Sequence, residues 1–107
     1  MNLILRTPIA ADSHAYRANF WILCLTGTGD GRVTTDPERG PIEGRGFFRE
    51  PDISWRRYQL EVDGSRYPDI VHVRPGDRLS LDDARVFEVA MVASGEGGHT
   101  RLELLRS

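Results

Sequence analysis

The sequence predicts an all-β protein: a small antiparallel barrel or sandwich of about seven short strands, with a short helical or irregular segment at the N-terminus. Its last third, from Val73 to Arg106, alternates short apolar runs with turn residues such as Pro75-Gly76-Asp77. From Trp55 onwards apolar and polar residues alternate, which is the pattern of a strand buried on one face. Turn signals recur about every eight to twelve residues, a spacing typical of sandwiches and barrels.

The N-terminal part of the chain is expected to differ from the rest. Pro8 to Asn19 contains four alanines and the candidate N-caps Asp12 and Ser13, so a short helical segment is expected there. The apolar run from Phe20 to Leu25 has the length of a strand buried on both faces. We therefore expect an N-terminal arm or helix plus a first strand over residues 1–31. The β-barrel core is expected over residues 32–107, and the two parts form a single domain.

Glycines and prolines dominate the stretch from Thr26 to Pro41. A short strand is expected at 32–35, and the rest of this stretch is expected to be a flexible loop because it contains Gly27, Gly29, Gly31 and Gly40. Extended structure resumes from Ile42 to Arg49. Apolar residues at alternate positions predict the core, and we expect burial of Phe47, Leu60, Val62, Leu79, Leu81, Val89 and Leu104.

The composition fits a folded domain with a small core. The chain has 107 residues, of which 39% are hydrophobic, and its formal net charge of -2 gives no overall basic field for nucleic acid. The single cysteine, Cys24, excludes an intrachain disulfide framework and a Cys-based zinc site, and its apolar neighbours indicate a buried thiol in a reducing compartment. We expect no secretory signal, because the apolar start is short and Arg6 and Pro8 interrupt it, and no membrane-spanning segment.

Two short motifs resemble chemical sites, but a structural interpretation explains each of them better. The segment from Thr26 to Arg32, Thr-Gly-Thr-Gly-Asp-Gly-Arg, has the glycines of a phosphate-binding loop. It lacks the Gly-Lys-Ser/Thr ending and a following helix, so we interpret it as a loop between strands. The paired carboxylates Asp82-Asp83 fill the position where a hairpin needs turn residues.

The histidines give no sign of a metal or catalytic site. His14, His72 and His99 are expected in separate elements, without the spacing of metal ligands. Asp12, Ser13 and His14 are adjacent, and adjacent residues cannot face one another as a catalytic triad must. We therefore expect no catalytic residue, no bound metal and no cofactor, and a protein that is not an enzyme.

Arginine supplies all 14 basic residues, and several of these arginines alternate with aromatic residues between Arg45 and Tyr67. This pattern allows a small barrel that binds single-stranded nucleic acid through stacking rings and guanidinium groups. Acidic residues in the same region cancel the charge, which favours a protein interface. The candidate interface residues are Arg49, Trp55, Arg56, Arg57 and Arg106.

Ordered along the chain, these segments resemble the phage head-tail joining proteins, in particular the lambda-type head-tail attachment, or head completion, family. The resemblance covers about residues 32 to 106. The segments that carry it are Val33-Thr34-Thr35, Gly46-Phe47-Phe48-Arg49-Glu50-Pro51-Asp52-Ile53-Ser54, Val73-Arg74-Pro75-Gly76-Asp77-Arg78-Leu79-Ser80-Leu81, Phe87-Glu88-Val89 and Arg101-Leu102-Glu103-Leu104-Leu105.

The resemblance implies a structural virion protein of a phage or prophage. Copies of such a protein form a ring in the neck, and the ring joins the DNA-filled head to the tail. Its expected partners are further copies of itself, the portal or connector protein, and tail proteins. DNA would pass through the ring without being specifically bound, and no membrane is involved. The expected location is the virion neck, with the host cytoplasm before assembly.

Overall fold

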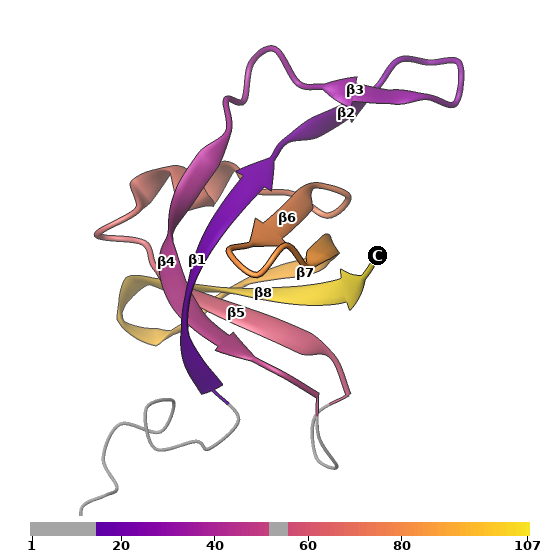
Figure 1. Ribbon diagram of the computed structural model, residues 1–107. Helices are drawn as coiled ribbons and strands as arrows, with labels where there is room; N and C mark the ends of the chain where they lie inside the picture. The colour runs from indigo at the N-terminus through magenta and orange to yellow at the C-terminus, as the bar shows by residue number, and fades with distance from the viewer. Residues whose placement is uncertain (1–14, 52–55) are drawn as a thin grey trace, which may run out of the picture.

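Six antiparallel strands close into a barrel, and a separate two-stranded ribbon extends from one end of it (Figure 1). This computed structural model describes residues 15–51 and 56–107. The barrel order is β1-β4-β5-β8-β7-β6, and the ribbon consists of β2 and β3. The barrel strands are β1 (Ala15–Leu23), β4 (Ile42–Arg49), β5 (Tyr58–Asp63), β6 (Arg78–Leu81), β7 (Val86–Ser94) and β8 (His99–Arg106). The ribbon strands are β2 (Leu25–Gly27) and β3 (Val33–Thr35), and the 3₁₀ turns are η1 (Pro68–His72) and η2 (Glu96–Gly98).

Strand β1 closes the barrel because it pairs with β4 on one side and with β6 on the other. Ile22 lies opposite Ile42 on β4 and opposite Leu79 on β6. The expected helical turns are therefore wrong for Ala15 to Asn19, where two ladders of backbone hydrogen bonds outweigh the helix propensity of alanine. The barrel also begins before residue 32, where we expected its core to start.

Alternation along β1 places its apolar residues inside and its polar residues outside. Ala18, Phe20 and Ile22 are buried, whereas Trp21 is 55% exposed. The run from Phe20 to Leu25 was expected to be buried on both faces, and this expectation is wrong because the barrel wall has only one dry face.

The barrel interior holds the core that the alternation predicts, with one exception. Six of the seven expected residues are buried: Leu60, Val62, Leu79, Leu81, Val89 and Leu104. Phe47 is half-buried on the outer wall, and its neighbour Phe48 is fully buried in its place. A shift of one residue along a strand exchanges the two faces, so the error on β4 is one of register.

Two glycines let other groups approach β4 closely. A Cβ atom on Gly46 would lie 2.6 Å from the carbonyl oxygen of Glu61 on β5. A Cβ atom on Gly44 would lie 2.7 Å from the ring of Tyr67, which packs against the core beside β4. Any larger residue at either position would push these groups apart.

Residues 1–14 and 52–55 lie outside the described residues. The expectations for the remainder of the segment from Pro8, for the candidate N-caps, for His14 and for Trp55 fall there. Within 15–51 and 56–107, no helix has the length and apolar character that crossing a bilayer requires.

Candidate functional site

The β2–β3 ribbon is the most exposed part of the described chain. It projects beyond the barrel in Figure 1, and the molecule measures 57 × 29 × 22 Å along its principal axes. All of β3 is exposed, and Val33 keeps 63% of its accessible surface. A β-branched strand that buries so little against its own barrel has its side chains available to another molecule.

The ribbon turns through a tip that a carboxylate organises. The backbone amide of Thr28 donates to the carbonyl oxygen of Arg32 at 3.1 Å, which closes the turn. Asp30 accepts hydrogen bonds from the Thr28 hydroxyl and from the Arg32 amide, and these bonds lower the pKa of Asp30. Gly29 and Gly31 adopt φ values of 89° and 87°, so glycine is required at both positions. The expected loop over Thr26 to Pro41 is therefore wrong for Thr26 and Gly27, which belong to β2.

A buried arginine fastens the base of the ribbon to the barrel. The guanidinium group of Arg39 makes two hydrogen bonds to the carboxylate of Asp77, at 2.7 and 3.0 Å. It also donates to Asp36 at 2.8 Å, to the carbonyl oxygen of Leu25 at 2.8 Å and to the carbonyl oxygen of His72 at 2.9 Å. One side chain thus joins β2, the segment after β3, the end of η1 and the turn before β6.

Asp77 completes this cluster by accepting hydrogen bonds from the backbone as well. Its carboxylate accepts the amide of Leu25 at 3.0 Å and the amide of Arg74 at 2.8 Å. The side chains of Arg39 and Asp77 are 7% and 1% exposed. The two carboxylates raise the pKa of Arg39, the contribution of Asp77 being the largest, and the hydrogen bond from Arg39 lowers the pKa of Asp36. We call Arg39, Asp36 and Asp77 the clamp.

Sequence reasoning missed the clamp. Asp77 was interpreted as a turn residue, and Arg39 was placed in the expected loop. Both residues belong to types that are seldom fully buried, and 38 positions separate them in the chain. Nothing local in the sequence distinguishes Arg39 from the other arginines.

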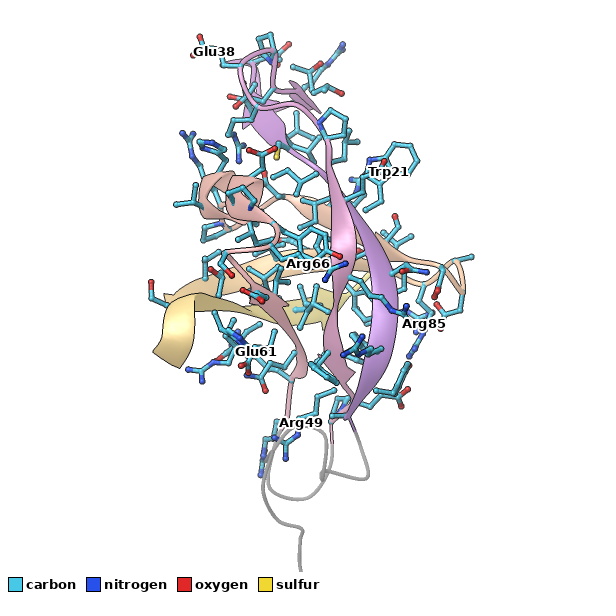
Figure 2. The ribbon with its side chains drawn as sticks, turned by 90° about the vertical axis from the view of Figure 1, so that its left-hand side faces the viewer. Trp21, Glu38, Arg49, Glu61, Arg66 and Arg85 are labelled. Carbon is cyan, nitrogen blue, oxygen red and sulfur yellow. The ribbon has the colours of Figure 1, made fainter. Side chains whose placement is uncertain are left out.

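The predicted interface arginines gather at the opposite end of the barrel from the ribbon. Arg49 ends β4, Arg56 and Arg57 precede β5, and Arg106 ends β8. The pairing of Tyr58 with Leu104 brings the start of β5 beside the end of β8. Arg49 is half-buried and lies near this end in Figure 2, and the other three are exposed. Arg57 lies 3.7 Å from Glu103, and the guanidinium group of Arg106 lies 5.7 Å from the centroid of the Phe87 ring.

A further arginine, Arg85, covers the aromatic core at this end of the barrel. Its guanidinium group lies 5.0 Å from the centroid of the Phe48 ring and donates to the Tyr16 hydroxyl at 2.7 Å. It also pairs with Asp83 at 2.8 Å. Phe48, Phe87 and Tyr58 pack below it with centroid separations of 4.9 to 5.8 Å. These contacts place Arg85 in the packing of the barrel.

The aromatic residues expected to stack on nucleic acid are largely taken up by this packing. Phe48 is buried, and Phe47, Tyr58 and Tyr67 are half-buried. The exposed aromatic side chains in the described part of the chain are Tyr16 and Trp21, both on β1.

The other motifs have structural surroundings. His72 ends η1, where a strand residue was expected, and His99 starts β8, where a solvated turn residue was expected. His99 Nδ1 lies 2.9 Å from Glu61 Oε2. Asp83 accepts the amide of Arg85 in the β6–β7 turn. Among residues 15–51 and 56–107, no three His, Cys, Asp or Glu side chains gather as a metal site would require.

Comparisons with protein-family models, with curated proteins and with solved structures found no match to this chain. The functional argument therefore depends on the sequence and on the geometry described above.

Proposed function

We propose that the chain is a structural protein of a phage neck, where copies of it form a ring that joins the DNA-filled head to the tail. The observation that carries the proposal is the exposed β2–β3 ribbon fixed to a closed barrel by the buried clamp. A rigid barrel with a projecting ribbon presents two different surfaces, and a ring requires contacts between unlike surfaces of successive copies. The strand edges of the ribbon have no partner beyond β2 and β3 in the described residues, and exposed edges favour such contacts.

The basic end of the barrel supports a second contact. Exposed guanidinium groups at Arg56, Arg57 and Arg106 can pair with carboxylates on the portal protein or on the next copy. Because the ribbon and these arginines lie at opposite ends of the barrel, one copy can engage two neighbours at once. The tip of the ribbon, from Gly27 to Gly31, is expected to be mobile in the free protein and to become ordered against a neighbour.

The alternative function is binding of single-stranded nucleic acid. It would need exposed rings beside the arginines, and the four described rings of that region are half-buried or buried. Filter binding to oligonucleotides at low and moderate salt separates the two functions. Tight binding that weakens strongly with salt would favour the alternative and contradict the neck proposal.

The experiment that tests the neck proposal uses the phage or prophage that encodes the chain. Reversing the charge of Arg56 and Arg57 together, to glutamate, should leave the monomer folded because both side chains are exposed. Lysates should then accumulate separate filled heads and tails, which electron microscopy counts directly.

The matched control for this experiment reverses two exposed arginines near the ribbon end, Arg74 and Arg78. It introduces the same change in charge away from the proposed basic contact, and it should yield complete virions. Normal assembly of the Arg56/Arg57 variant would move the interface to the ribbon or to the N-terminal residues. Normal assembly after deletion of the whole reading frame would contradict the neck role.

A further inference from the structure

A hollow of about 260 Å³ lies on the outer wall of the barrel beside the region where the β4–β5 ladder ends. The ladder joins Phe47–Arg49 to Gln59–Glu61, and the two strands separate beyond it. Three arginines contribute to the lining: Arg17 from β1, Arg45 from β4 and Arg66 from the turn before η1. In Figure 2, Arg66 lies between β4 and β5, on the side of the barrel where Glu61 is seen.

Packed groups define the shape of this hollow. The close approach of β4 to β5 at Gly46 fixes its floor, since a Cβ atom there would meet backbone at 2.6 Å. Two rings support two of the arginines. The guanidinium group of Arg17 lies 5.4 Å from the centroid of the Phe47 ring, and that of Arg66 lies 5.9 Å from the centroid of the Tyr67 ring. Cation–π contacts of this kind orient a guanidinium plane without neutralising its charge.

The three arginines are not neutralised by the rest of the described chain. No ion pair joins Arg17, Arg45 or Arg66 to a carboxylate within 15–51 and 56–107, and all three side chains are exposed. This contrasts with Arg39 and Arg85, each of which pairs with two carboxylates. The guanidinium donors in the hollow are therefore available to a ligand.

Both carboxylates in the hollow already have partners of their own. Glu61 lies 2.9 Å from His99 Nδ1. Asp63 accepts the Ser65 amide at 3.0 Å and the Ser65 hydroxyl at 2.7 Å, and these bonds lower the pKa of Asp63, so it remains negatively charged near neutral pH. With His99 neutral, three guanidinium groups against two carboxylates leave one net positive charge in the lining.

We propose that this hollow binds an acidic segment of a partner protein, whose Asp or Glu carboxylates pair with Arg17, Arg45 and Arg66. Carboxylate matches the planar donor fork of arginine, and two arginines held over rings lose less freedom on binding than free ones. A nucleic-acid backbone carries a charge on every residue, so Glu61 and Asp63 would repel it. The single net charge fits a short carboxylate-bearing peptide better than a polyphosphate. The inference does not depend on the neck role, because it concerns a different face from Arg56 and Arg57.

A fluorescent hexa-aspartate peptide is the probe, and fluorescence anisotropy with the full chain is the measurement. Each single substitution Arg17→Gln, Arg45→Gln and Arg66→Gln should weaken binding by about fivefold to tenfold, the usual effect of losing one charge-assisted contact. The triple variant should abolish measurable binding. The matched controls Arg32→Gln and Arg74→Gln remove the same charge from exposed positions outside the hollow and should change binding by less than about twofold. Unchanged melting temperatures verify that every variant is folded.

Amide chemical-shift changes on peptide addition locate the site independently of the variants. They should cluster at Arg45, Gly46, Phe47, Arg66 and His99. Equal weakening by the hollow and control substitutions would overturn the proposal, because it would indicate diffuse charge attraction. An oligo-dT strand that binds as tightly as the peptide and shifts the same amides would assign the hollow to nucleic acid instead. Self-association of the wild type that the triple variant loses would assign it to a second copy, which also overturns the proposal.

Discussion

The barrel and the ribbon are built from the same short β-branched and glycine-punctuated sequence, yet they are stabilised in opposite ways. The barrel encloses a set of fully buried apolar side chains, among them Phe48, Phe87, Leu60 and Leu79. The ribbon has no apolar core of its own, and every residue of β3 is exposed. What fastens it to the barrel is a charged cluster around Arg39. Apolar burial determines where the barrel strands lie, whereas directional hydrogen bonds determine where the ribbon points.

This difference has an energetic consequence. Apolar contacts are many and individually weak, so a barrel tolerates the loss of one of them. A buried ion pair is different, because removing one partner leaves the other charged, desolvated and unpaired. Replacing both partners of such a pair together costs much less. The clamp should therefore respond sharply to single substitutions and mildly to paired ones.

The largest effect is expected at Asp77. Asp77→Ala leaves the 7%-exposed Arg39 side chain without its bidentate partner and removes the acceptor of the Leu25 and Arg74 amides. The variant should lose about 3–5 kcal/mol of unfolding free energy. Urea unfolding followed by circular dichroism measures it. The double variant Arg39→Met with Asp77→Leu is the control and should be more stable than Asp77→Ala alone. Equal stability of the wild type and Asp77→Ala would show that the clamp is open in solution.

The next effect concerns the barrel. Leu81 is 5% exposed and lies opposite Phe20 on the closing strand. Leu81→Ala should cost about 2–4 kcal/mol through lost burial and the cavity it leaves. Thermal unfolding is the measurement. An unchanged melting temperature would show that the register of β6 is wrong.

A pH dependence follows from Asp36. The hydrogen bond from Arg39 lowers the pKa of Asp36 in the folded protein, so the folded state binds this proton less readily than the unfolded chain does. The resulting stabilisation is present above the ordinary Asp pKa of about 3.9 and is lost as the pH falls through the folded value. The difference in unfolding free energy between the wild type and Asp36→Asn should therefore shrink between pH 6 and pH 3. A difference that stays constant over this range would contradict the contact.

The smallest effect is expected in the ribbon. Val33 is 63% exposed, and Val33→Ser should change the unfolding free energy by less than about 0.5 kcal/mol. In the assembly assay the same variant should reduce joining if the ribbon docks against a neighbour. A large loss of stability in the isolated chain would mean that Val33 packs against this chain after all.

Local patterns in the sequence were enough to predict much of the barrel. The turn at Pro75-Gly76-Asp77, the alternation in β5 and the buried positions of the last strands follow from rules that act over a few residues. Strand β1 was missed at its start, because alanines indicate helix when read locally. The pairing that makes them a strand comes from β4 and β6, far along the chain.

The candidate site was harder to predict for the same reason. The end-to-end placement of Arg56, Arg57 and Arg106 depends on the β5–β8 register, which the sequence does not state. The hollow at Arg17, Arg45 and Arg66 draws on several elements that meet only in the closed barrel. The clamp depends on one arginine that composition cannot distinguish from the rest.

Amide hydrogen exchange on the free chain tests the contrast between the clamped base and the exposed tip most directly. The Leu25 amide donates to Asp77 at 3.0 Å and the Asp36 amide donates to the carbonyl oxygen of Cys24 at 2.9 Å, so both should exchange slowly. The amides of Gly29 and Gly31 at the tip should exchange quickly, and Asp77→Ala should release Leu25 while the barrel amides stay protected. Strong protection across Gly27 to Gly31, or exchange at Leu25 and Asp36 as fast as at the tip, would contradict the account.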